Sequence, residues 1–122
     1  MVPQKNNRQK NWRYGLIAEA ICTLSLRLRG YRILARRFET PLGEIDIIAR
    51  RGNLIAFIEA KARQNLELAA HSIGKQQQSH IARAAELFMQ RHSSLAQCQL
   101  RFDAMLIAPR RIPRHIRDAW RK

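Results

Sequence analysis

Residues 43–63 read GEIDIIARRGNLIAFIEAKAR, with two runs rich in Ile, Leu, Ala and Phe on either side of Gly52 and Asn53. This dipeptide is suited to the two-residue turn of a β-hairpin. We therefore predict antiparallel strands over residues 44–51 and 54–62. This hairpin is the starting point for the rest of the predicted fold.

A two-residue loop fixes the register of the hairpin, and places Asp46 directly opposite Glu59 and Glu44 directly opposite Lys61. Two carboxylates opposite each other destabilise a sheet by repulsion. A hard divalent cation such as Mg²⁺ removes that repulsion and keeps water ligands for a substrate phosphate. The alternative is a salt-bridged surface patch neutralised by Lys61 and nearby arginines.

The N-terminal part of the chain predicts a helix over about residues 13–29, which ends at Gly30. Large apolar residues recur there at helical spacing, namely Ile17, Ile21, Leu24 and Leu28. Glu19 is the only charged residue between Tyr14 and Leu26. An unpaired carboxylate on a buried helix is unfavourable. Glu19 therefore lies on the open face of the helix, or it points at the cation.

The remaining predicted elements are a strand over 31–39, a turn at 40–43, a loop at about 63–71, a helix over 72–92 and a strand over 99–107. Residues 1–11 are expected to form a basic disordered arm, and residues 109–122 a basic C-terminal tail, either disordered or a short helix. Residues 12–108 would then form one α/β domain around a small mixed sheet.

The chain has 122 residues, which suits one domain, and its 23 Lys and Arg against 9 Asp and Glu give a net charge of +14. Such a basic field favours a polyanionic partner, above all nucleic acid. No apolar run approaches the roughly 20 residues of a membrane span, and no signal peptide is recognisable, so we expect a cytoplasmic protein without membrane contact. Cys22 and Cys98 have no ligand spacing, which argues against a zinc site or a disulfide framework.

Several short motifs in order along the chain carry a family resemblance. They are Gly15-Leu16-Ile17-Ala18-Glu19, Gly30-Tyr31-Arg32-Ile33-Leu34, Gly43-Glu44-Ile45-Asp46-Ile47-Ile48, Phe57-Ile58-Glu59-Ala60-Lys61-Ala62-Arg63, Lys75 and Arg101-Phe102-Asp103. In these motifs the sequence resembles the YraN family of small proteins described as endonucleases (uncharacterised protein family 0102). That family is a branch of the PD-(D/E)xK nuclease superfamily, related to archaeal Holliday-junction resolvases.

The resemblance implies a restriction-endonuclease-like, three-layer α/β/α fold and a site that holds Mg²⁺ or Mn²⁺. It implies that Asp46 and Glu59 are metal ligands, with the Ala60 carbonyl, that Lys61 lies near the attacking water, and that Glu19 completes the acidic site. The implied activity is hydrolysis of phosphodiester bonds in DNA. Branched or flap structures are an expectation by analogy with relatives.

Three further residues are candidates for contact with nucleic acid. Arg63 shares a strand face with Glu59, Lys75 belongs to the resemblance, and the Gln77 amide could approach the site or a phosphate, although a solvated helix surface also explains it. For Arg101 and Asp103 we expect an internal charge pair or a helix-cap contact rather than catalysis.

Two other hypotheses stay open. The chain could be a nucleic-acid-binding module that keeps the fold without cleaving, or an assembly factor that docks on an acidic protein. A homodimer is one arrangement that suits a branched substrate, because such a substrate presents two equivalent strands.

Overall fold

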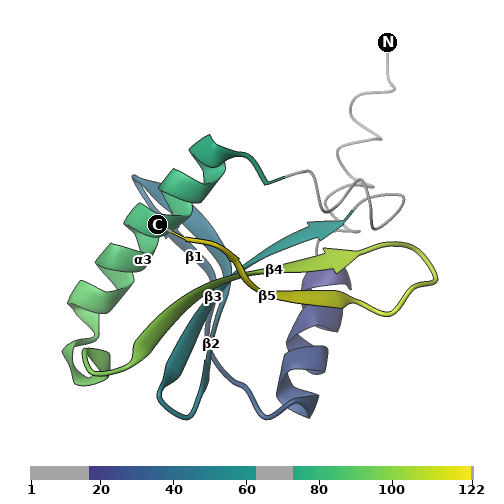
Figure 1. The fold of residues 1–122 in the computed structure, drawn as a ribbon, viewed down its shortest axis with the longest axis horizontal. Coiled ribbons are helices and arrows are strands. Elements are labelled where there is room, and N and C mark those ends of the chain that lie inside the picture. The colour runs from purple at the N-terminus through teal and green to yellow at the C-terminus, as the bar shows by residue number, and fades with distance from the viewer. Residues whose placement is uncertain (1–16, 63–72, 122) are drawn as a thin grey trace.

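The computed structural model describes residues 17–62 and 73–121 (Figure 1). The chain forms a helix over residues 17–28, followed by β1 (Arg32–Thr40), β2 (Gly43–Arg51), β3 (Leu54–Ala62), α3 (Lys75–Arg91), the 3-10 turn η1 (Ser93–Leu95), β4 (Gln99–Ile107) and β5 (Arg114–Trp120). The five strands form one sheet in the order β1-β2-β3-β4-β5. Only β3 and β4 pair in parallel, so the sheet is mixed, as predicted.

The two helices lie on opposite faces of the sheet and make three layers (Figure 1). Side chains of β3 alternate between the faces because a strand has a period of two. Ile55 and Phe57 pack in the core under α3, whereas Ala56 and Ile58 pack under the helix of residues 17–28. An apolar run buried on both faces thus places β3 in the middle of the sheet.

The helix of residues 17–28 confirms the predicted element, and the structure shows which of its apolar faces is buried. Ala18, Cys22 and Leu26 are buried, whereas large apolar residues of the predicted stripe are exposed, with Ile17 at 58%, Ile21 at 40%, Leu24 at 59% and Leu28 at 79%. Small residues allow the helix to lie close to the sheet, so the side with Ala18 and Cys22 faces inward. Helical spacing alone could not choose between two apolar faces.

The predicted hairpin is present, with Gly52 at φ +61° in its turn. Its register is the predicted one from the pair Arg51 and Leu54 to the pair Ile47 and Ile58. The ladder recorded between β2 and β3 ends there, so it includes neither of the two predicted acidic rungs. Beyond this point β2 separates from β3, and the site described below occupies the end of the ladder.

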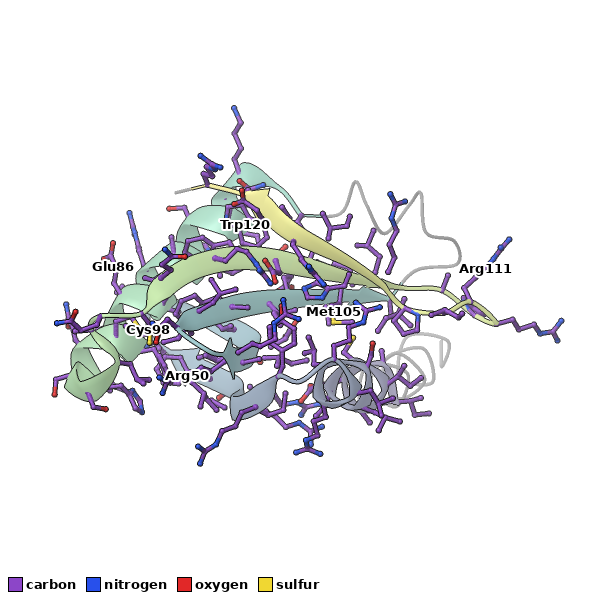
Figure 2. The ribbon with its side chains drawn as sticks, turned by 60° about the horizontal axis from the view of Figure 1, so that its bottom comes forward. Arg50, Glu86, Cys98, Met105, Arg111 and Trp120 are labelled. Atoms are coloured by element: carbon purple, nitrogen blue, oxygen red, sulfur yellow. The ribbon has the colours of Figure 1, made fainter. Side chains whose placement is uncertain are left out.

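The C-terminal segment corrects a prediction, because residues 114–120 form β5 and not a tail or a helix. This strand pairs with β4, and the Trp120 ring stacks on Phe102 with 5.6 Å between ring centroids. The apolar residues of this segment recur at helical spacing, which was misleading. Trp120 reaches the core from a strand at the edge of the sheet. Arg111 lies in the turn before β5 and extends away from the body of the protein (Figure 2).

The docking of α3 depends on Gly43 at the start of β2. A Cβ atom there would lie 2.5 Å from the backbone oxygen of His80, far inside any normal contact. The close approach sets the N-terminal half of α3 against the β1–β2 turn, where the Thr40 hydroxyl accepts the N–H groups of Leu42 and Gly43. No helix in the described ranges has the length and apolar character needed to cross a membrane.

Candidate active site

Asp46 lies where β2 separates from β3. Its side chain accepts the hydrogen bond that a backbone carbonyl of β2 would accept in the next rung of the ladder. The Asp46 Oδ2 atom accepts the backbone N–H of Ala60 at 2.8 Å. The ladder between β2 and β3 ends at Ile47 and Ile58, so it includes neither of the expected pairs, Asp46 with Glu59 and Glu44 with Lys61. On its other side, Glu44 pairs with Glu39 of β1. The Asp46 side chain nevertheless lies at the level of Glu59, next to Ala60.

Glu59 is 6% exposed and has three polar neighbours. The Gln77 amide of α3 donates to Glu59 Oε1 at 2.7 Å, and Lys61 Nζ lies 3.4 Å from the same oxygen. The third neighbour is Asp46, whose carboxyl group shares a hydrogen bond with that of Glu59. Two strands and one helix thus converge on a single buried carboxyl group.

The electrostatics of this pair follow from burial and like charge. Burial, and next the negative charge of Asp46, raise the pKa of Glu59 from 4.5 to about 8, although Lys61 acts in the opposite direction. Burial also raises the pKa of Asp46 above its ordinary value, against the effect of the Ala60 N–H. Near neutral pH the pair therefore favours one shared proton, because the single Lys61 ammonium compensates only part of the repulsion between two adjacent carboxylates.

Glu19 is buried, and two consecutive arginines of β1 bind it. Arg36 Nε lies 3.3 Å from one carboxylate oxygen and Arg37 Nε lies 2.9 Å from the other. Neighbouring strand residues normally point to opposite faces. Arg37 has φ 51°, a left-handed conformation that lets it point to the same face as Arg36. Glu19 therefore does not lie on an open face of the helix, and the two arginines compensate its charge. That it points at a cation stays a prediction.

The negative charge of Glu19 reaches the Asp46 region, since it contributes to the raised pKa of Asp46. Cys22 lies in the same region, and burial, followed by the charges of Asp46 and Glu19, raises its pKa to about 12. Its thiol is therefore neutral and a poor metal ligand. Both cysteines are free, as predicted.

The other sequence-predicted contacts separate into three groups. Gln77 reaches the site directly through Glu59. Lys75 is exposed at the first residue of α3, close in sequence to Gln77. Arg63 lies outside the described residues. The roles predicted for Glu19 as a metal ligand and for these residues as nucleic-acid contacts stay predictions.

A second buried acid, Asp103 of β4, has an entirely different environment. Arg101 binds both of its oxygens at 2.7 Å, and His115 Nε2 lies 2.8 Å from Oδ2. The backbone N–H of Asp118 donates to Oδ1 at 2.9 Å. Burial alone would raise the pKa of Asp103, but these partners hold it below its ordinary value. The predicted internal charge pair of Arg101 and Asp103 is confirmed.

Sequence reasoning missed the residues that hold these acids in place. Arg36 and Arg37 gave no signal, because the left-handed backbone at Arg37 is not visible in an Arg-Arg pair. His115 gave no signal either, because the β5 strand that brings it to Asp103 was not predicted. An Asp at the centre of an apolar strand is itself a signal that cations must lie nearby.

A metal ion at the Asp46 site would be held by carboxylates from two strands, β2 and β3. Among the residues that the structure describes, no group of three or more His, Cys, Asp or Glu side chains could hold a metal ion. Mg²⁺, however, is often held by one or two carboxylates with waters and phosphate. The N–H and C=O of one strand residue point to the same side, so the Ala60 carbonyl faces the Asp46 side as its N–H does. Two carboxylates and one carbonyl fit such an ion.

A model of the uncharacterised protein family UPF0102 matches residues 18–107. The chain belongs to this family. A UPF0102 protein of Parvibaculum lavamentivorans is 49% identical over 90% of this chain and 83% of its own length. One from Nitrobacter winogradskyi is 52% identical over 87% of this chain and 90% of its own. The UPF0102 protein amb4503 of Paramagnetospirillum magneticum is 46% identical over 98% of this chain and 96% of its own.

The match to the UPF0102 family covers the acidic site but not β5. Glu19, Asp46, Glu59 and Lys61 all lie within the matched residues. The match ends at residue 107, so Trp120 lies beyond it. The UPF0102 relatives show the family of the chain but not the chemistry of its site.

Proposed function

We propose that this protein is a nuclease that uses Mg²⁺ or Mn²⁺ to hydrolyse phosphodiester bonds of DNA. The observation that supports the proposal is the close approach of two carboxyl groups, the half-buried Asp46 and the buried Glu59, with the Lys61 ammonium 3.4 Å from Glu59. A fold that only needed stability would have no reason to bury two acids together. An arrangement that stores repulsion at one point is typical of an ion-binding or catalytic site.

The ligands in this proposal would be Asp46, Glu59 and the Ala60 carbonyl, with Glu19 contributing negative charge from behind. A bound divalent ion supplies an activated water and stabilises charge on the phosphate. The chain's own residues supply position. Gln77 fixes the rotamer of Glu59 through the 2.7 Å contact. Lys61 places a cation where an anionic phosphate oxygen or the attacking water can be oriented.

The charge of the whole chain supports nucleic acid as the substrate. A net charge of +14 attracts phosphates and raises their local concentration near the site. Arg36 and Arg37 add positive charge next to the acids, at 45% and 40% side-chain exposure. Their contacts with Glu19 leave part of each guanidinium at the surface, where phosphate can reach it.

The test uses labelled single-stranded, duplex, flap and four-way-junction DNA, with Mn²⁺ or with EDTA. We expect cleavage by wild type only with Mn²⁺, and a loss of at least about 100-fold in Asp46→Asn and Glu59→Gln. Glu39→Gln is the matched control, because it removes one exposed acid of β1 and the same charge. Cleavage that survives EDTA, or equal cleavage by all variants, would refute the proposal. Binding of these DNAs without any cleavage would instead favour the non-catalytic binding module.

A further inference from the structure

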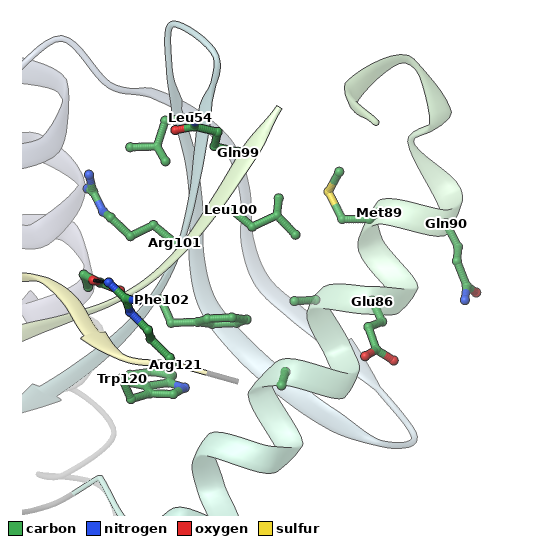
Figure 3. Close-up of a pocket in the computed structure, with 13 residues that line it drawn as sticks. Leu54, Glu86, Met89, Gln90, Gln99, Leu100, Arg101, Phe102, Trp120 and Arg121 are labelled. Carbon is green, nitrogen blue, oxygen red and sulfur yellow. Dashed lines mark hydrogen bonds and ion pairs between the residues drawn. The ribbon is translucent and has the colours of Figure 1, made fainter. Parts of the chain in front are cut away.

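A groove lies between α3 and the β4–β5 edge of the sheet, on the face that α3 covers incompletely (Figure 3). α3 packs mainly on β2 and β1, so β4 and β5 are less covered. The hollow has a volume of about 720 Å³, which is within the range of small-molecule sites. Its apolar wall is formed by Met89, Leu100, Phe102 and Trp120.

Two largely buried aromatic rings, stacked on each other, and one unused donor belong to this wall. Trp120 stacks on Phe102 at an interplanar angle of 25°. Trp120 is 9% exposed, and its indole Nε1 is buried without a hydrogen-bond partner in the described part of the chain. In Figure 3 the nitrogen lies on the edge of the indole that faces α3. A buried N–H normally has an acceptor, so the groove is suited to a planar ligand that brings one.

Charge around the groove favours an anionic chain attached to that planar group. Four basic residues line this groove or the adjoining hollow, against two acids, Glu86 and Asp118; they are Lys75, Arg83, Arg121 and Arg101, of which Arg101 is already paired with Asp103. Asp118 is bound to Arg121 at 3.1 Å. The adjoining hollow, of about 360 Å³, continues along α3 to Lys75. Lys75 and Gln77 both belong to the first turn of α3, so the hollow ends at the same end of this helix from which the Gln77 amide contacts Glu59.

We propose that this groove binds an unpaired nucleobase of the strand whose phosphate reaches Asp46 and Glu59. The proposal rests on the proposed nuclease function and narrows its substrate to nucleic acid with unpaired nucleotides. A base has a π-face for stacking and ring nitrogens or carbonyl oxygens that accept from Trp120 Nε1. A base inside a duplex presents neither its face nor its pairing edge to a protein groove. Single strands, flaps and junctions with unpaired bases are selected over intact duplex.

Fluorescence gives a direct readout, because Trp12 and Trp120 are the only tryptophans of the chain. In a Trp12→Phe background, emission reports on Trp120 alone. We expect an unlabelled single-stranded oligothymidylate to quench this emission in EDTA, and the same strand with abasic sites to quench much less. Equal responses to both strands would overturn the proposal. A change of emission with protein concentration alone, without DNA, would assign the groove to a second copy of the chain and overturn it as well.

A charge-matched pair of variants separates the groove from the general basic field. Leu100 is 46% exposed in the groove, and Leu28 is 79% exposed on the helix of the other sheet face. Leu100→Glu should weaken binding of single-stranded DNA in EDTA on the order of 10-fold, whereas Leu28→Glu should change it little. Trp120→Phe keeps the stacked ring and removes the donor, and should lower the preference for normal over abasic strands. Equal effects of both glutamates would contradict the proposal.

All of these binding measurements are made without divalent metal, so they are independent of cleavage. Base-dependent binding without any cleavage would refute the nuclease proposal and keep the groove. Metal-dependent cleavage with no preference for normal over abasic strands would refute the groove and keep the nuclease.

Discussion

Two buried acidic clusters lie in the same sheet and have opposite electrostatics. Asp103 has a guanidinium, an imidazole and a backbone N–H as partners, and its pKa is below the ordinary value. Glu59 lies beside another carboxyl group with one ammonium nearby, and its pKa is raised to about 8. The first cluster is complete in itself, whereas the second lacks positive charge. The comparison teaches that burial of an acid is not by itself a functional signal; incomplete compensation is.

The largest expected effect comes from breaking the compensated cluster. Asp103→Asn leaves Arg101 and His115 without their carboxylate, and should lower the free energy of unfolding by about 3–5 kcal/mol. Urea denaturation at pH 7 measures it. The pKa of Asp103 is lowered in the folded state, so its contribution is present above the unfolded pKa and is lost as pH falls. The variant should therefore lose less stability than wild type on acidification, and a parallel loss would show that Asp103 is not the acid-labile group.

Near pH 8, Glu59→Gln should raise the free energy of unfolding, in contrast to Asp103→Asn. The pKa of Glu59 is raised from 4.5 to about 8 on folding, so folded protein binds more protons than unfolded protein between these values. Wild-type stability, relative to the variant, is greatest below pH 4.5 and should fall by roughly 2–4 kcal/mol as pH rises to 8. Denaturation of metal-free protein at pH 5 and pH 8.5 tests this. A constant difference at both pH values would mean that folding does not raise the pKa of Glu59.

Gly43→Ala should disturb one cluster and spare the other. A Cβ atom 2.5 Å from the His80 oxygen forces the N-terminal half of α3 outward, which carries Gln77 away from Glu59. We expect a loss of about 1–3 kcal/mol in unfolding free energy. Amide chemical shifts around Glu59 should change, while those around Asp103 should not. Changes spread evenly over both clusters would indicate a global response instead.

The smallest expected effect is that of Gln77→Ala. The amide donates to Glu59 Oε1, which favours the charged carboxylate, so its loss should raise the pKa of Glu59 by a few tenths of a unit. The stability change should be about 1 kcal/mol or less. Gln76→Ala, one residue earlier on the exposed side of α3, is the control. An NMR titration of the Glu59 carboxyl carbon measures its pKa in both variants. An equal change of this pKa in Gln77→Ala and Gln76→Ala would mean that Gln77 does not act on Glu59.

The sequence predicted the parts of the fold that depend on local chemistry. The turn at Gly52 and Asn53 and the alternation of β3 determined the hairpin, and with it the neighbourhood of Asp46 and Glu59. The inner face of the first helix and the strand β5 could not be predicted, because both depend on what packs against them. Ala18 and Cys22 face inward since the sheet is close, and Trp120 belongs to a strand since Phe102 offers a stacking partner.

The site was predictable as a set of acids but not as a geometry. Asp46 could be placed at the level of Glu59, yet its bond to the Ala60 N–H exists only because β2 joins the ladder with β3 at Ile47, one residue after Asp46. The arginine pair that compensates Glu19 depends on the positive φ of Arg37, for which an Arg side chain gives no cue.

The most direct test of the difference between the clusters is calorimetric titration of Mn²⁺ into metal-free protein at pH 8, in two buffers of different ionisation enthalpy. Wild type and Glu39→Gln should bind one ion and release protons, because the ion displaces the proton shared by Asp46 and Glu59. Glu59→Gln should bind at least about 10-fold more weakly and release fewer protons. No binding by wild type, or equal binding and proton release by all three proteins, would contradict the assignment of this pair as a metal site.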